Sequence, residues 1–359
     1  MPTLSLCMIV KNEQDTLDTC LSSVKEAVDE IIIVDTGSTD TTKNIAYRYT
    51  DKVYDFAWAD DFAAARNFAF SKASSDYIIW LDADDYISPE NLEKLLFLKN
   101  KVLNGKIKQI AANYDVAFDE NGNPALTYKR ERIFLRKANM QWIGAVHEVI
   151  PLLADAYYSD FTVIHKKVHP TPKGRNLAIY EKLIRSGAKL DARQQFYYAR
   201  ELYYNAEYEK AAEKFNKFLL NPDGWLENKI SACLDLSRCY AKLNDKETAI
   251  SSLLKSFEYD SPRAEHCCEL GNLFLEKNKL DQAIFWYITA MRSIKDTSNG
   301  GFVSPECYGY IPCIQLCVCY DRKGNHISAY RYNEAAAKYK PDSSSVKYNR
   351  EYFKSIGIE

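Results

Sequence analysis

The chain has 359 residues and a formal net charge of −2, so no basic excess points to nucleic acid or an anionic membrane as its main partner. Hydrophobic residues make up 47% and charged residues 27%, which is ordinary for a globular protein, and the length predicts two domains. The N-terminal MPTLSLCMIVKNE does not resemble a signal peptide, and no apolar run approaches the roughly 20 residues of a membrane span. We therefore expect a cytoplasmic protein without a transmembrane segment.

The ten cysteines do not form a metal-binding pattern, because none of them has C-x-x-C spacing and no histidine pair completes a zinc motif. In a reducing compartment they are expected to be small apolar core residues. A disulfide framework is the minority alternative.

Short apolar runs alternate with helix-like stretches over about the first 165 residues. The runs are β-branched or aromatic-rich, and polar residues follow each of them: 4–10, 31–34 and 77–81. The helix-like stretches lie at 14–28, 39–49 and 61–72. This alternation predicts βαβ units and a largely parallel sheet.

The second half, from about Asp191, is a succession of helical segments with an internal repeat. Four pairs of small residues are separated by 12 positions: Ala199 and Ala211, Ser237 and Ala249, Gly271 and Ala283, Cys317 and Ala329. The second members recur at intervals of 38, 34 and 46 residues, and the tetratricopeptide repeat has a period of about 34. The pattern predicts a tetratricopeptide-type domain over 191–359, with a loop at 296–305 in the longest interval. An irregular helical bundle is the alternative.

Polar and acidic residues follow each of the three apolar runs. These are Lys11-Asn12-Glu13, the segment 35–40 (DTGSTD) and the segment 82–85 (DADD). Ligands of open α/β sheets bind outside the carboxyl ends of the strands. We therefore expect these residues to lie at one edge of one sheet and to form a binding site there.

The 82–85 segment is the sharpest of these features. Several neighbouring carboxylates are unfavourable unless water or a cation compensates them, and Mg²⁺ or Mn²⁺ takes carboxylate and phosphate oxygens as ligands. The alternative is an acidic turn that caps a helix starting near Pro89. No glycine-rich dinucleotide loop and no Walker A pattern occurs, so neither a nicotinamide cofactor nor an NTPase is supported.

Four ordered motifs, LSLCMIVKNE, IIIVDTGSTDTT, FAWADDFAAARNFA and YIIWLDADD, resemble family 2 glycosyltransferases of the GT-A fold. The resemblance covers 1–165, extending to about 190, and implies a Rossmann-like α/β domain that binds a nucleotide-diphosphate sugar.

The resemblance also implies residue roles. Val10 and Glu13 would border the base and ribose of the donor, Asp35 would contact the nucleoside (uridine or another), and Arg66 would lie near the donor phosphates. Asp82 and Asp84 would form the D-x-D pair for Mn²⁺ or Mg²⁺, with Asp84 as the more direct ligand and Asp82 on ribose or metal.

Inverting sugar transfer needs a base that takes the acceptor proton. In the segment 142–148 (WIGAVHE), which resembles the family's W-x-G-x-V-H-E stretch, we expect Glu148 to be the base and His147 the second choice. Trp142 offers a ring for a sugar face. The alternative is that His147 and Glu148 form a structural pair at a strand edge.

Two histidines follow in VIHKKVHP. The resemblance favours His165 over His169 as a further metal or diphosphate ligand, although a lone histidine is as often structural. Lys166 and Lys167 could also meet phosphate or be solvated.

The fusion with tetratricopeptide repeats resembles peptide S-glycosyltransferases of the sublancin type and related bacterial glycan transferases. The repeat groove could hold an acceptor polypeptide or mediate homodimerisation. We expect an inverting, metal-dependent transferase that moves a sugar from a nucleotide-diphosphate sugar, a UDP-sugar in the first instance, to a peptide, protein or glycan. The alternatives are a non-catalytic scaffold with a degenerate transferase domain and, less favoured, a nucleotidyltransferase.

Overall fold

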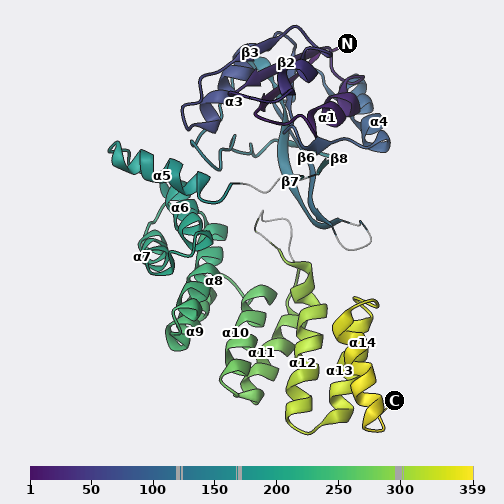
Figure 1. Cartoon of the computed structure of the whole chain (residues 1–359), viewed down its shortest axis with the longest axis vertical. Helices are drawn as coiled ribbons and strands as arrows, with labels where there is room; N and C mark the ends of the chain where they lie inside the picture. The colour runs from purple at the N-terminus through teal and green to yellow at the C-terminus, as the bar shows by residue number, and fades with distance from the viewer. Residues whose placement is uncertain are drawn as a thin grey trace. The chain divides into compact units, whose positions relative to one another are not determined.

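A computed structural model describes residues 1–118, 122, 124–166, 168, 172–295, 301 and 303–358. Lys167, His169 and most of the loop predicted at 296–305 lie outside the described residues. The chain divides into two compact units, Met1–Ala188 and Lys189–Glu359, which are coloured purple to teal and teal to yellow in Figure 1. We describe each unit by itself.

An eight-stranded sheet forms the centre of the first unit, in the order β3-β2-β1-β4-β7-β6-β8-β5. Its central strands are rich in β-branched and aromatic residues and are almost wholly buried, as expected for strands covered on both faces. The strands are β1 (Leu4–Val10), β2 (Glu30–Asp35), β3 (Val53–Asp55), β4 (Tyr77–Trp80), β5 (Asp85–Tyr86), β6 (Gln109–Phe118), β7 (Pro124–Leu135) and β8 (Tyr157–His165).

The sheet is parallel in one half and mixed in the other. Strands β3, β2, β1 and β4 are all parallel to their neighbours, as the alternation of strands and helices predicts. Beyond β4, β7 pairs antiparallel with β4 and β6, β8 runs parallel to β6, and β5 pairs antiparallel with β8. The prediction of a largely parallel sheet therefore holds only for the first half, because β6 and β7 form a long hairpin that needs no crossover helix.

Helices cover both faces of this sheet. Alternate residues of β1 point to opposite sides, so Leu6 and Met8 join the core under α1 and α4, whereas Cys7 joins the core under α3. Asp61 caps α3 through the Ala64 amide, and Ser88 precedes Pro89 at the start of α4. The helices are α1 (Leu17–Val24), α2 (Thr42–Ala46), α3 (Phe62–Ser71), α4 (Pro89–Phe97), a π-helical turn (Leu98–Val102) and α5 (Arg175–Arg185).

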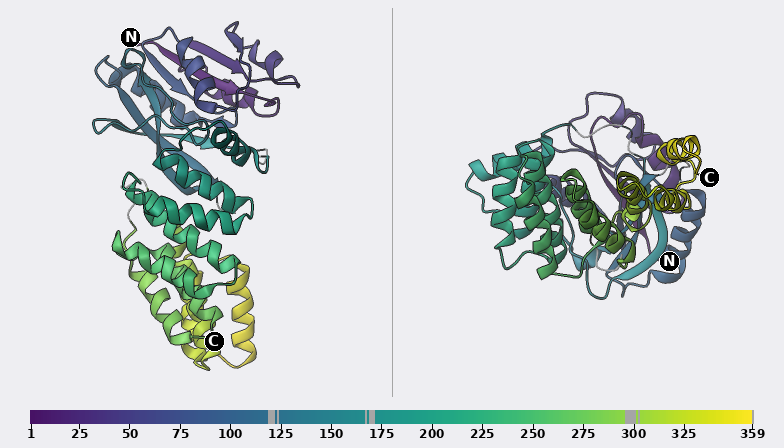
Figure 2. Two further views of the ribbon diagram at one scale, coloured as in Figure 1. Left: turned by 90° about the vertical axis from the view of Figure 1, so that its left-hand side faces the viewer. Right: turned by 90° about the horizontal axis from the view of Figure 1, so that it is seen from below.

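The second unit consists of helices that pair along the chain, and Figure 2 shows the pairs stacked on one another. All eight small residues of the predicted repeat are buried where two helices meet. A Cβ atom added at Gly271 would lie 2.7 Å from the ring of Tyr287, which explains why the repeat has its smallest residue there. The helices are α6 (Ala192–Tyr204), α7 (Tyr208–Leu219), α8 (Leu226–Lys242), α9 (Lys246–Lys255), α10 (Ala264–Glu276), α11 (Leu280–Arg292), α12 (Tyr310–Arg322), α13 (His326–Ala337) and α14 (Ser344–Ser355).

All ten cysteines are free and buried, in accordance with their expected place in the core. Among the helices that the structure describes, none has the length and apolar character needed to cross a bilayer.

Candidate active site

The turns that follow β1, β2 and β4 meet at the carboxyl edge of the parallel half of the sheet. Val10 is in register with Asp35, and Cys7 is in register with Trp80, so the segments after these strands leave the sheet side by side. The structure therefore brings Glu13, Asp35 and the 82–85 turn to the same edge.

The first two turns are tied to each other. The amide of Asn12 donates to Ser38 Oγ over 2.9 Å, and the amide of Thr39 donates to Asn12 Oδ1 over 2.8 Å. The amide of Glu13 donates to Thr42 Oγ1, and Glu13 Oε2 accepts from Thr16 Oγ1. Val10 is 3% exposed, and its carbonyl accepts from the amide and hydroxyl of Thr36. Val10 and Glu13 thus shape the edge mainly through their own backbone groups.

Asp35 ends β2 as a buried carboxylate that is 2% exposed. Its Oδ2 accepts from the amides of Gly37 and Ser38, at 3.1 and 2.9 Å, and Gly37 takes the positive φ of +104° that this tight turn requires. Its buried Oδ1 has no hydrogen-bond partner among the described residues. A buried acceptor without a partner is costly, so this oxygen is suited to a donor group from a ligand.

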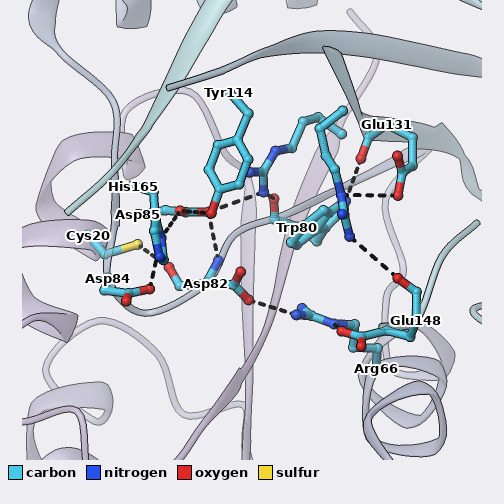
Figure 3. Close-up of polar contacts among 12 residues, drawn as sticks. Cys20, Arg66, Trp80, Asp82, Asp84, Asp85, Tyr114, Glu131, Glu148 and His165 are labelled. Atoms are coloured by element: carbon cyan, nitrogen blue, oxygen red, sulfur yellow. Dashed lines mark hydrogen bonds and ion pairs between the residues drawn. The ribbon is translucent and has the colours of Figure 1, made fainter. Parts of the chain in front are cut away.

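The side chain of Asp85 is completely buried. It organises the 82–85 turn through the polar contacts that Figure 3 shows. Its Oδ2 accepts from the Asp82 amide at 3.0 Å and from Arg132 at 3.1 Å, and its Oδ1 accepts from the Tyr114 hydroxyl at 2.9 Å. His165 Nδ1 lies 3.3 Å from the same Oδ1. Asp85 therefore connects the turn after β4 with strands β6, β7 and β8.

Asp84, Asp85 and His165 form the group of potential metal ligands in the described part of the chain, with one ligand atom of each within 4.8 Å of the others. His165 Nδ1 is 3.4 Å from Asp84 Oδ1. Burial raises the pKa of Asp84, and the charges of Asp82 and Asp85 add to this although His165 opposes it. Burial alone would lower the pKa of His165, but its hydrogen bond to Asp85 and the charge of Asp84 outweigh burial and raise it.

Asp82 points away from this group toward Arg66. Arg66 Nη2 donates to Asp82 Oδ1 at 2.7 Å, and Arg66 Nε donates to Glu148 Oε1 at 2.8 Å. Burial by itself would raise the pKa of Asp82, but the charge and hydrogen bond of Arg66 outweigh it and hold the pKa at about 2. Of the three predicted metal ligands, the structure thus brings Asp84 and His165 together with Asp85, whereas Asp82 contacts Arg66.

Trp142 is buried, at 2% exposure, and its ring contacts Trp80 and Arg66. Asn67 holds its backbone, because the Trp142 amide donates to Asn67 Oδ1 and the Asn67 amide group donates to the Trp142 carbonyl. This placement favours a role for Trp142 in holding Arg66 over a role as a sugar platform. The segment then turns sharply, with φ of +95° at Gly144 and +54° at the half-buried His147.

Two residues behind the site, Arg132 and Tyr114, were not among the predicted site residues. Arg132 is fully buried with its guanidinium 3.9 Å from the Trp80 ring and 4.2 Å from the Tyr114 ring. Burial raises the pKa of Tyr114, and the charge of Asp85 raises it further. Arg132 and Tyr114 come from the antiparallel hairpin β6–β7, and the charged run Lys129 to Arg132 in β7 does not by itself show which of its side chains is buried.

The fold is an α/β unit of the GT-A type, followed by tetratricopeptide-type helices. Comparison with known proteins agrees, because residues 5–151 match the family described as Glycosyl transferase family 2. The first unit therefore carries a glycosyltransferase family 2 domain, and the predicted resemblance and fold class are confirmed.

Two relatives extend the comparison. A TPR repeat-containing protein of Synechococcus elongatus is 38% identical over 152 residues, which cover 42% of this chain and 36% of that protein. The SPbeta prophage-derived glycosyltransferase SunS of Bacillus subtilis is 26% identical over 267 residues, 70% of this chain and 57% of SunS. The chain therefore spans between a third and three fifths of the length of these relatives.

Among solved structures, glucosyl-3-phosphoglycerate synthase from Mycobacterium tuberculosis in complex with Mn²⁺ and UDP-glucose is similar at a TM-score of 0.38 and 16% identity. The similarity covers 53% of this chain and 82% of that one, and at this level it supports no argument about the site.

Proposed function

We propose that the protein is a metal-dependent, inverting glycosyltransferase that moves a sugar from a nucleotide-diphosphate sugar, a UDP-sugar in the first instance, to a peptide or protein acceptor. One observation carries the proposal. In a family 2 domain, a carboxylate–histidine group and a buried carboxylate oxygen that has no partner among the described residues lie at the same ligand-binding edge of the sheet.

Mn²⁺ or Mg²⁺ would be held by Asp84 and His165, with Asp85 beside them. The residues fit a cation, because burial and, after it, the charges of Asp82 and Asp85 raise the pKa of Asp84, and a divalent ion would stabilise the charged carboxylates. When bound, the ion supplies charge stabilisation to the leaving diphosphate. Asp82, at the same edge and 32% exposed, is assigned to the donor ribose or to the metal.

The nucleoside would bind against the turns after β1 and β2. Asp35 Oδ1 would accept from a base N–H or a ribose hydroxyl, since it is the buried acceptor at this edge that has no partner among the described residues. Val10 and Glu13 would form the adjoining wall, held by the hydrogen bonds between the two turns.

Glu148 is our assignment for the base. Arg66 directs one of its carboxylate oxygens, and the other would take the proton of the acceptor thiol or hydroxyl as the sugar is transferred. His147, at the adjacent position, is the second candidate. The similarity to SunS over parts of both units, together with the concave surfaces that tetratricopeptide domains form for peptides, favours a polypeptide acceptor over a glycan.

The test is a nucleotide-release assay with the full chain, a panel of UDP-, GDP- and dTDP-sugars and Mn²⁺ or Mg²⁺. We expect slow hydrolysis of one donor that stops when the metal is chelated and that Asp84→Ala abolishes. A peptide library and lipid-linked glycans are then offered with that donor. Transfer to glycans alone would reassign the acceptor. No release of any nucleotide and no nucleotide binding would favour the scaffold alternative.

A further inference from the structure

Arg66 occupies an unusual position in the first unit. It lies on α3 with its side chain 8% exposed, and its guanidinium is 4.7 Å from the Trp80 ring centre and 4.9 Å from that of Trp142. The two rings meet edge to face at 5.0 Å. The following residue, Asn67, fixes the Trp142 backbone through two hydrogen bonds. The Arg66 side chain therefore has little freedom to turn toward a different partner.

The two nitrogen atoms that Arg66 uses face different segments of the chain (Figure 3). Nε donates to Glu148, at the end of the 142–148 segment, and Nη2 donates to Asp82, in the turn after β4. A planar guanidinium can serve two carboxylates in this way, whereas the single ammonium of lysine is a point charge on a flexible stem. One buried cation thus compensates two carboxylates that are 66 positions apart in the sequence.

We propose that Arg66 is a positioning residue that couples the acceptor side of the site to its donor side, and that it does not bind the donor diphosphate. The proposal rests on the function proposed above, in which Asp82 belongs to the donor side and Glu148 takes the acceptor proton. Through Arg66, the position of Glu148 depends on the turn that carries Asp82, Asp84 and Asp85.

This assignment differs from the role that the family resemblance suggests for Arg66, which is contact with the donor phosphates. Both hydrogen bonds that Arg66 makes to Asp82 and Glu148 are short and charge-assisted, and its guanidinium carbon lies 4.7 and 4.9 Å from the centres of two tryptophan rings. A phosphate that took the Nε or Nη2 hydrogen bonded here would have to displace one of these carboxylates, so we assign these two donors to positioning.

The first test needs no ligand. Asp82→Asn and Glu148→Gln are made singly and together, and the equilibrium constant of unfolding is measured by urea titration of the full chain. Each single change leaves Arg66 one carboxylate, whereas the double change leaves a buried guanidinium without either. Each single change should raise the equilibrium constant of unfolding by some factor. We expect the factor for the double variant to exceed the product of the two single factors by between about 3- and 100-fold.

The same four proteins are then compared in an Arg66→Met background. There the factor for the double variant should equal the product of the two single factors, because the cation that both carboxylates share has been removed. Arg130→Lys is the matched control. Arg130 lies 5.3 Å from the same Trp80 ring, forms its ion pair with Glu131 and donates to the backbone carbonyl of Glu148 at 3.5 Å. Because this contact uses the Glu148 backbone and not its carboxylate, the Asp82–Glu148 coupling should persist in Arg130→Lys. A multiplicative cycle with Arg66 in place, or an unchanged coupling in Arg66→Met, would overturn the proposal.

The second test separates positioning from phosphate binding. With UDP and Mn²⁺, Arg66→Met should keep the Kd within about threefold of the wild type while metal-dependent donor hydrolysis falls at least about tenfold, and Arg66→Lys should behave in the same direction. A rise in the Kd for UDP of about tenfold or more, the loss expected for a charge-assisted hydrogen bond, would assign Arg66 to the diphosphate. If the wild type binds no nucleotide, the proposed function fails, and the ligand-free cycle still decides whether the coupling exists.

Discussion

The carboxylates at the two edges of the sheet in the first unit differ in how far hydrogen bonds and ion pairs compensate them. At the amino edge, Glu30 accepts from Ser5, Lys52 and both donors of Ser74. At the carboxyl edge, Asp35 keeps a buried oxygen without a partner among the described residues, and Asp84 has a raised pKa.

The other acidic residues of the amino edge are satisfied in the same way as Glu30. Asp29 Oδ2 accepts from the Leu4 amide and pairs with Lys99, each at 2.7 Å, and Asp76 accepts from the amide and hydroxyl of Thr3. These contacts tie β1, β2 and β4 together where they begin. The comparison teaches that acidic residues at a sheet edge indicate a site only where the fold leaves their charge or lone pairs uncompensated.

The largest effect should follow from Asp84→Ala. Because a catalytic metal contributes several kcal/mol of transition-state stabilisation, metal-dependent donor hydrolysis should fall about 1,000-fold or more. Nucleotide release measured over a range of Mn²⁺ concentrations checks this. The matched change at the other edge is Glu30→Gln, which should leave the rate unchanged, and equal losses in the two variants would remove the distinction between the edges.

Asp85→Asn should affect both stability and metal binding. It leaves the fully buried Arg132 without its carboxylate, which typically costs about 3–5 kcal/mol in the free energy of unfolding. It also weakens the hold on His165, so Mn²⁺ affinity should fall about 10- to 100-fold, as for other residues that orient metal ligands. Urea unfolding and a Mn²⁺ titration followed by electron paramagnetic resonance measure the two effects. A variant with normal stability and normal affinity would exclude the organising role of Asp85.

Gly271→Ala extends the comparison to the repeat unit. Its new Cβ would lie 2.7 Å from the buried Tyr287 ring, and such overpacking usually costs about 1–3 kcal/mol. We expect a lower melting temperature for the repeat unit, seen by calorimetry, with an unchanged Kd for UDP. Serine at the same position should cost at least as much. A loss of UDP affinity would mean that the repeats contribute to the donor site.

The smallest effect concerns Glu30 and pH. Burial alone would raise the pKa of Glu30, but its bonds from Lys52, Ser5 and Ser74 outweigh burial and hold it at about 2, below the usual 4.5. A lowered pKa stabilises the fold above the unfolded-state value and this contribution is lost as pH falls through the folded-state value.

Unfolding experiments between pH 5 and about pH 2 should therefore show a loss on the order of 2 kcal/mol in the wild type that is absent in Glu30→Gln. If the free energy of unfolding falls equally with pH in the two proteins, the hydrogen bonds and the ion pair of Glu30 do not stabilise its charged form as described.

Much of the fold could be predicted from the sequence. The strands β1, β2 and β4 and the repeat helices have strong periodic patterns, and the small residues Ala199, Gly271 and Ala283 set the register of the repeat helices directly. The mixed half of the sheet was missed, because β6, β7 and β8 are long strands whose pairing depends on contacts between distant segments, which local patterns do not contain.

The site could be predicted only in part. That Asp35 and the 82–85 segment lie at one edge follows from the strand ends, and His165 was favoured by the family resemblance, but strand ends do not tell which carboxylate of the 82–85 segment faces the edge. The orientation of these carboxylates depends on contacts from other elements. Arg132 and Tyr114 donate hydrogen bonds to Asp85, and Arg66 donates one to Asp82. The residues that compensate these charges come from other strands and helices, so the sequence did not show which carboxylate each of them contacts.

The central claim is that the carboxyl edge binds a metal and a nucleotide together, and calorimetric titration of the full chain with UDP tests it most directly. We expect binding in the presence of Mn²⁺ that weakens at least about tenfold when the metal is chelated, a difference of about 1.4 kcal/mol or more. The Glu30→Gln variant should behave like the wild type. Equal affinity with and without Mn²⁺, or no binding of UDP, GDP or dTDP under either condition, would contradict the account.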